Sequence, residues 1–145
     1  MSSTVETSIW LALRSRVESL DIGVDVKMYP GELPQTPPSS GGVLQPYLRV
    51  GRVSADPVSP LIAYGKPSVR TGSLVVTLVH PLSASYTVSR YDQLAGLIAR
   101  HFVDGTQMRH GDICVTVTDY PSVQEGYEDN GYWTVPVIIP WRTFA

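Results

Sequence analysis

The side chains able to do chemistry in this chain are few and scattered. Three histidines, His80, His101 and His110, are the first candidates for a site, and Asp104 and Asp112 lie near two of them. Histidine and carboxylate ligands hold transition metals, but the one-residue gap between His110 and Asp112 matches no metal-binding motif. His101 falls where a helix should end, and the helix dipole favours a cation there. We therefore expect structural roles, with no metal and no cofactor.

Nucleophilic and phosphoryl chemistry lack their usual sequence patterns. No serine lies in a Gly-x-Ser-x-Gly turn, and no lysine lies in a Gly-x-x-x-x-Gly-Lys loop. Cys114 alternates with apolar residues in an expected strand, away from a helix N-terminus that would stabilise its thiolate. Although a fold can assemble catalytic groups from distant residues, we predict that the chain is not an enzyme.

The composition is that of one soluble globular domain. A chain of 145 residues, 43% hydrophobic and 17% charged, suits a single core, so we expect one domain over residues 1–145. No apolar run reaches the ~18 residues that a membrane helix needs, and we expect neither secretion nor a membrane partner. The formal net charge of −2 gives no overall attraction to nucleic acid.

Two segments have the apolar period of an amphipathic helix. The first should begin at a capping box over Ser3 to Glu6. The second should open at Ser89 and end before Gly105. Their apolar stripes consist of Val5, Ile9, Ala12, Leu13, Val17 and Leu20 in the first, and Tyr91, Leu94, Ala95, Ile98 and Phe102 in the second.

Five segments have the alternation or the apolar run of a strand. They cover residues 24–28, 47–53, 73–80, 113–117 and 132–143. The third is apolar on both faces, which favours a central strand. Residues 30–46 are rich in proline and glycine, so we expect a long loop without a hydrogen-bonded ladder. A mobile loop and a contact arm are both compatible with this segment.

The order α-β-β-β-α-β-β predicts an α+β fold. We expect a two-layer sandwich with two helices packed on one face of a mainly antiparallel five-stranded sheet. The other face should carry Val53, Val75, Val79 and Ile138 among polar neighbours, which suits either a wet face or a self-association surface. Pro136 and Pro140 lack N–H groups on the same side of the last strand, and this suggests an edge strand that is blunted against strand addition.

Charge is distributed unevenly along the chain. Basic side chains gather in the middle strands and their connection, and acidic side chains gather in a late loop. The two groups are Arg49, Arg52, Lys66 and Arg70, and Asp119, Glu125, Glu128 and Asp129. Both groups suit ordinary solvated surface. Our sharper hypothesis is a subunit interface in which the basic group of one copy meets the acidic group of the next, because head-to-tail contacts can close into rings.

Several short segments, read in order, resemble a known family. They are Pro46-Tyr47-Leu48-Arg49-Val50, Arg70-Thr71-Gly72, Leu94-Ala95-x-x-Ile98-Ala99-x-x-Phe102, Gly105-Thr106, Trp133 and Val137-x-Ile139-x-Trp141-Arg142. Over nearly the whole chain, this pattern resembles the phage tail-terminator-like family of long-tailed bacteriophages. The resemblance implies a subunit that assembles as a hexameric ring on the tail tube, stops tube polymerisation and offers a surface for the head.

The resemblance also implies partners and a location. The partners are other copies of the chain, the major tail tube protein and a head-closure or connector protein, with DNA passing near the ring lumen. The location is the head-proximal end of the virion tail, after assembly in the host cytoplasm. We expect contacts from three loops, residues 31–42, 56–66 and 120–130.

Two other readings stay open from the sequence. A head-closure or neck subunit shares the size and the ring symmetry of a terminator. A small monomeric hydrolase or ligand-binding domain would instead hold a pocket between helices and sheet.

Overall fold

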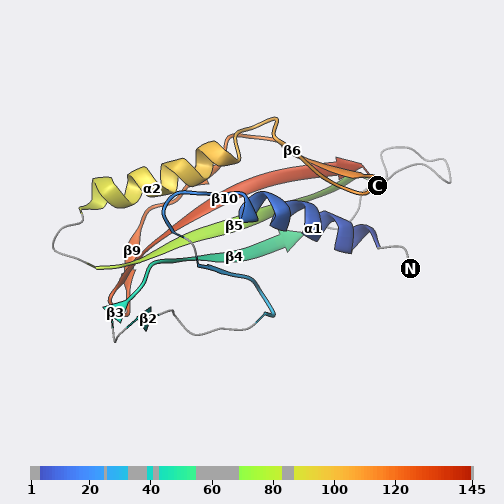
Figure 1. Ribbon diagram of the computed structural model, residues 1–145. Coiled ribbons are helices and arrows are strands. Elements are labelled where there is room, and N and C mark those ends of the chain that lie inside the picture. Colours follow the sequence, from blue (N-terminus) through green and yellow to red (C-terminus); the bar gives the residue numbers. More distant parts are fainter. Residues whose placement is uncertain are drawn as a thin grey trace.

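A long twisted sheet with two helices forms the molecule in this computed structural model (Figure 1). The structure describes residues 4–24, 26–32, 39–40, 43–54, 69–82 and 87–144. The helices are α1 (Val5–Glu18) and α2 (Val88–His101). The main sheet has the order β1 (Lys27–Met28), β4 (Tyr47–Ser54), β5 (Val69–Pro81), β10 (Tyr132–Phe144), β7 (Ile113–Val117) and β6 (Gln107–His110).

Short strands complete the topology. β8 (Ser122–Val123) and β9 (Tyr127–Asp129) both pair with β10, and β2 (Ser39–Ser40) pairs with β3 (Val43–Leu44) apart from the main sheet. The β1–β4 pair is parallel, and the other pairs of the main sheet are antiparallel. The α+β class and the mainly antiparallel sheet are therefore confirmed, whereas the strand number and order differ from the expected five.

All five expected strands exist, as β1, β4, β5, β7 and β10, so the additional strands account for the difference. β6, β8 and β9 are two to four residues long and mostly polar. They owe their extended form to pairing with β7 or β10, and they lack an apolar period that would reveal them. The β2–β3 pair also corrects the expectation that residues 30–46 hold no ladder.

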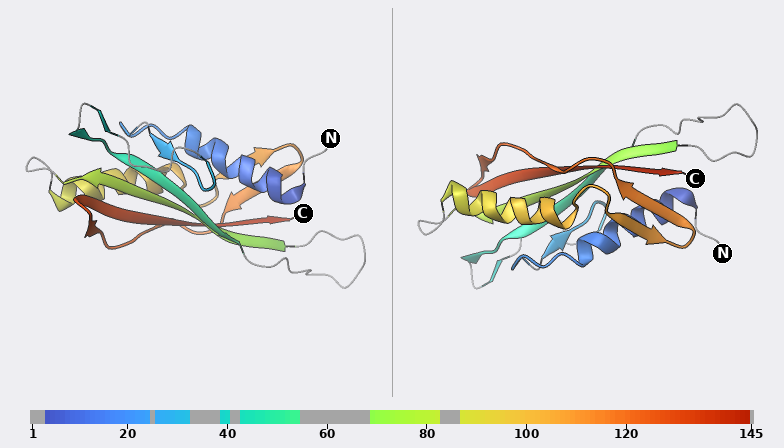
Figure 2. Two further views of the ribbon diagram at one scale, coloured as in Figure 1. Left: turned by 90° about the horizontal axis from the view of Figure 1, so that it is seen from below. Right: turned by 90° about the horizontal axis from the view of Figure 1, so that it is seen from above.

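Both helices share one core with one face of the sheet. α1 contributes Ile9, Leu13 and Val17, and α2 contributes Leu94 and Ile98. The strands add to the same cluster every second residue, in the sets Leu48 and Val50, Leu74, Val76 and Leu78, and Val135, Val137, Ile139 and Trp141. Figure 2 shows α2 in front of the strands from above and behind them from below, so one face stays free of helices.

The last strand is central, which corrects the expected edge strand. β10 pairs along all thirteen of its residues with β5 and on its other side with β9, β8 and β7. The carbonyls of Pro136 and Pro140 accept hydrogen bonds from Gln124 and Thr118 on that second side. Because N–H and C=O of one strand residue point the same way, the missing N–H groups fall where the partner side is divided into short strands.

The helix ends differ in detail from the expected signals. Thr4 is the N-cap of α1, and its side chain accepts a 3.2 Å bond from the backbone N–H of Thr7. Glu6 reaches Arg70 on β5 and does not close a capping box. Thr87 precedes α2 without a side-chain cap bond. The apolar stripes predicted both helices correctly, while the identity of the capping residues depended on neighbours distant in sequence.

Candidate assembly surfaces

The basic side chains of the middle strands do not form one patch. Arg49 is exposed on the helix-free face, because it pairs with Thr77 in the odd-numbered set of β4. Arg52 lies on the opposite face, with its guanidinium 4.9 Å from the centre of the Trp10 ring. Such a cation–π contact holds the side chain without neutralising its charge. Lys66 lies outside the described residues.

Arg70 is engaged within its own chain. Its Nη1 atom donates to Glu6 Oε1 at 2.6 Å, and only 22% of the Arg70 side chain is exposed. The pKa of Glu6 is lowered, first by a backbone hydrogen bond at the start of α1 and then by Arg70. This pair ties the N-terminus of α1 to the start of β5, so Arg70 is less available to a neighbouring molecule than Arg49 or Arg52.

Two of the four acidic side chains lie on β9, and the other two lie in the connections that precede β8 and β9. Asp119, Glu125, Glu128 and Asp129 are all exposed, and none of the ion pairs in the described part of the chain includes them. Residues 118–131 contain no lysine or arginine. Glu128 and Asp129 are in β9, which joins β10 through Asn130 and Gly131 at φ angles of 52° and 83°. This is the left-handed geometry of a two-residue hairpin turn.

The described charges on β4 and on β9 lie toward opposite edges of the sheet. β5 and β10 separate β4 from β9, which puts the two strands about 14 Å apart at the usual strand spacing. Glu128 shares a face with Trp133, on the helix side like Arg52, whereas Asp129 shares the helix-free face with Arg49. The structure therefore places Arg49 and Arg52 on β4 and Glu128 and Asp129 on β9, at opposite edges of these four strands, whereas Arg70 lies on the central strand β5.

The helix-free face is partly apolar. Val53 is 65% exposed, Val75 and Ile138 are half-buried, and Val79 is buried. The sequence placed all four on this face correctly. Val79 belongs to a second small cluster with Met28, Tyr47 and Tyr132. Burial raises the pKa of Tyr47, Arg49 lowers it, and Tyr132 and Asp129 raise it further.

A hollow of about 360 Å³ lies at the other end of this face. Most of its lining belongs to the helix-free side of the sheet. The residues are Val53, Thr71, Gly72, Ser73, Thr118, Pro140 and Trp141. The indole Nε1 of Trp141 is buried and has no hydrogen-bond partner among the described residues.

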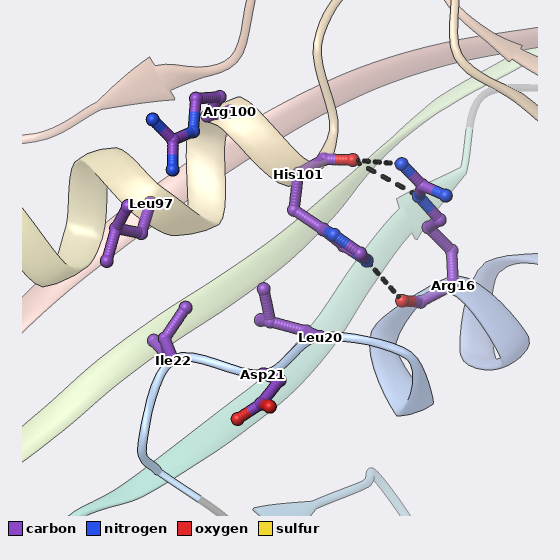
Figure 3. A pocket seen from close by; sticks show the side chains of 7 residues that line it. All are labelled: Arg16, Leu20, Asp21, Ile22, Leu97, Arg100 and His101. Atoms are coloured by element: carbon purple, nitrogen blue, oxygen red, sulfur yellow. Dashed lines mark hydrogen bonds between the residues drawn. The ribbon is translucent and has the colours of Figure 1, made fainter.

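A second hollow, of about 400 Å³, separates the C-terminal ends of the helices (Figure 3). Arg16 donates from Nε at 3.1 Å and Nη2 at 2.7 Å to the carbonyl of His101. His101 Nε2 lies 2.9 Å from the Arg16 carbonyl and 2.9 Å from Ser19 Oγ. Because a carbonyl only accepts, Nε2 carries the proton in this arrangement.

His101 connects the two helices through its contacts with Arg16 and Ser19. Burial lowers its pKa most, the nearby charges of Arg16 and Lys27 lower it further, and the Arg16 carbonyl acts in the opposite direction. The lowered pKa disfavours the cation that the helix dipole was expected to favour at this helix end. Arg100 and Asp21 lie on opposite sides of the hollow, with His101 directed toward α1 (Figure 3).

The other candidates for chemistry lie apart. His80 is buried with its ring 5.4 Å from that of Tyr91, and His110 and Asp112 are exposed at the β6–β7 turn. Among the described residues, no three histidine, cysteine, aspartate or glutamate side chains are grouped to hold a metal. No helix of the described residues is long and apolar enough to cross a membrane.

Comparison with known proteins identifies a family of structural proteins. A family model described as phage tail terminator protein matches residues 8–141. The chain belongs to the phage tail terminator family. This family is structural, so membership gives the protein a structural role in a phage tail and agrees with the predicted absence of catalysis.

Solved structures share the fold of this tail terminator family member. One, titled only with a sequence identifier, is 18% identical and covers 97% of this chain and 96% of its own, with a TM-score of 0.72. Another is a chain of the "Virion of native gene transfer agent (GTA) particle", 10% identical, covering 97% and 95%, with a TM-score of 0.56. No curated protein matches.

Six of the eight charged side chains predicted for a subunit interface are exposed in the structure. Arg49, Arg52, Asp119, Glu125, Glu128 and Asp129 are the six. Sequence reasoning missed Glu6, the partner of Arg70, because 64 residues separate the two. It also missed Tyr127, which is 47% exposed on β9 beside Glu128. Recognition of the Asn130-Gly131 turn would have revealed this hairpin.

Proposed function

We propose that the protein assembles as a ring on the head-proximal end of a phage tail tube. There it ends tube polymerisation and presents a surface for attachment of the head. The family match over residues 8–141 carries this proposal. The similar fold of a chain from a gene transfer agent virion agrees with a place in a tailed particle.

The mechanism is binding without bond formation. One side of the ring copies the interface that a tube subunit presents, so it docks on the last tube ring. The other side does not offer this interface again, and growth therefore ends. The partners are other copies of the chain, the tail tube protein below the ring and a head-closure or connector protein above it, and DNA passes through the lumen. A hexamer is the expected stoichiometry.

The charge pattern supports a head-to-tail arrangement of copies. Exposed cations on β4 and exposed carboxylates on β9 lie on opposite edges of one sheet. Such a subunit carries two different, complementary surfaces, which generate a ring when the rotation between copies closes. A subunit with one self-complementary patch would give a two-fold dimer in its place.

The decisive experiment measures the length of tail tubes. Purified tube protein is polymerised alone and with increasing amounts of this protein, and lengths are measured by electron microscopy. A terminator shortens the tubes in proportion to its concentration and is seen at one end. A head-closure protein leaves tube length unchanged and binds the portal side, so unchanged lengths together with portal binding would reject the terminator role.

A further inference from the structure

Among the described residues, two strand edges on opposite sides of the sheet carry backbone groups without a hydrogen-bond partner. On β4, the N–H of Leu48 donates to the carbonyl of Val26 at 2.9 Å. The backbone N–H and C=O groups of the even-numbered residues of β4 therefore point away from β5. β1 ends at Met28, which is opposite Arg49. The N–H and C=O of Arg52 therefore face outward, and no described residue bonds them. An outward edge of this kind is a template for another strand.

The other edge is the outer side of β9. Asn130 and Gly131 form the two-residue turn between β9 and β10. The residues that flank such a turn, here Asp129 and Tyr132, bond each other across the hairpin. Successive residues alternate in direction, so the N–H and C=O of Glu128 point away from β10. No described residue bonds the backbone of Glu128.

We propose that β4 of one copy pairs with β9 of the next copy, with Arg52 opposite Glu128, so that the sheet continues from subunit to subunit around the ring. This inference rests on the proposed ring and names the contact that closes it. The occupant of each edge is a second copy of this chain. Backbone hydrogen bonds supply the adhesion, as in other cases of strand addition.

The strand directions agree with this pairing. β4 is antiparallel to β5, β5 is antiparallel to β10, and β10 is antiparallel to β9. β4 and β9 therefore run in opposite directions within one copy. A neighbour that extends the same sheet keeps this relation, so the contact is an antiparallel pair. Arg52 and Glu128, each with both backbone groups outward, then form one hydrogen-bonded pair of such a ladder.

The side chains match on both faces in this register. Arg52 and Glu128 lie together on the helix side, with opposite charges. Val53, 65% exposed, comes opposite Tyr127, 47% exposed, on the helix-free side. Asp129 comes opposite Gly51, which places it diagonally across from Arg49. Cross-strand neighbours on one face interact in this way. A shift that sets Ser54 opposite Glu128 would instead put Asp129 opposite Val53.

The stagger of this register suits a closed ring. Val53 is level with Ser73 and Pro140, whereas Tyr127 is level with Thr134, six residues earlier on β10. Each copy contributes four strands to the continuous sheet, a width of about 19 Å. Over this width, the next copy is displaced by about 20 Å along the strand direction. These lengths correspond to a strand tilt of about 45°, at the upper end of the range found in closed barrels.

Disulfide trapping tests the register directly. The variant Val53→Cys/Tyr127→Cys is made in a Cys114→Ser background, and the ring is oxidised alone or on tube ends. Non-hydrogen-bonded antiparallel neighbours have Cα atoms about 4.5 Å apart, within disulfide range. In one copy the two positions are about 24 Å apart by the spacings above, which prevents an internal bond. Non-reducing gels should show a ladder of covalent multimers up to the ring size.

A matched control pair replaces Tyr127→Cys by Ser122→Cys, which is also exposed on the helix-free side of a short strand beside β10. The control should give no ladder. Rings that form normally but give no Val53–Tyr127 cross-link overturn the edge contact and leave the proposed function standing. Failure to form a ring, alone or with tube protein, overturns both.

Charge reversal provides an independent measurement. Arg52→Glu and Glu128→Arg should each weaken association by about fivefold, as expected for an exposed ion pair, and the double reversal should restore it. Asp112→Arg at the β6–β7 turn, on neither of the two proposed edge strands, makes the same charge change as Glu128→Arg and should leave association unchanged. Equal effects of all three single reversals, without restoration in the double variant, contradict the pairing.

Discussion

Gly72 on β5 is expected to be the least replaceable glycine of the described sheet. A Cβ atom at this position would lie 2.5 Å from the carbonyl oxygen of Val53 and 2.6 Å from Cζ2 of Trp141. The first of these is backbone of the neighbouring strand, and Trp141 is a buried core residue. Neither neighbour can move aside like the free end of a flexible chain. Gly72→Ala therefore requires a shift of the β4–β5–β10 ladder.

The expected cost is that of an overpacked core, about 1–3 kcal/mol. For a chain of this size, each kcal/mol lowers Tm by about 3 °C, so Gly72→Ala should melt about 3–10 °C lower. Gly96→Ala is the matched control, because its Cβ meets nothing within 4 Å and the residue lies inside α2. Alanine is a better helix former than glycine, so this control should gain about 0.5–1 kcal/mol.

Urea unfolding followed by circular dichroism, at low protein concentration to avoid assembly, measures both variants. The two substitutions each add one methyl group, but they should change the free energy of unfolding in opposite directions. If Gly72→Ala is as stable as the unchanged protein, the close approach of Trp141 and β4 to Gly72 is wrong. The same result would question the register of the β4–β5 ladder in this region.

Three further measurements follow from the contacts. Glu6→Gln should be less stable than the unchanged protein at neutral pH, and because the folded-state pKa of Glu6 is lowered, the difference should shrink as the pH falls through the carboxyl range. The pKa of His101 is also lowered, so this side chain stabilises the folded protein above the ordinary histidine pKa, and the stabilisation declines as the pH falls below that value. The free energy of unfolding of His101→Gln should therefore depend less on pH between pH 7 and 5 than that of the unchanged protein. Gly131→Ala, at φ 83°, should cost about 1 kcal/mol in urea unfolding, and an unchanged midpoint would contradict the left-handed turn.

Much of the fold could be read from local patterns. The stripe from Ile9 to Leu20 predicted α1, and the apolar run before His80 predicted the central strand β5, which is paired on both sides. Alternation along β10 placed Val135, Val137 and Ile139 on one side, and these residues are in the core. Such patterns can be recognised in a sequence because the buried face recurs every 3.6 residues in a helix and every 2 residues in a strand.

Pairing partners were harder to predict than the elements. The two prolines of β10 indicated correctly that one side of this strand lacks regular hydrogen bonds, but they led to the wrong conclusion of an outer edge. Three short strands fill that side, with Pro136 and Pro140 at their junctions. A missing donor marks a gap in a ladder, and the sequence does not say whether other strands lie on both sides of the gap.

For the candidate interface, too, local features were predictable from the sequence, whereas the contacts between distant segments were not. The sequence determined which charges exist, that Arg49 and Arg52 point to opposite faces of their strand, and that every charged residue between 118 and 131 is acidic. Only the tertiary structure decided that Arg70 pairs with Glu6, that Arg52 lies on Trp10, and that Glu128 is on the edge opposite β4. Side-chain direction repeats along a strand and is encoded locally, whereas the neighbour of an edge depends on strands brought together from distant parts of the chain.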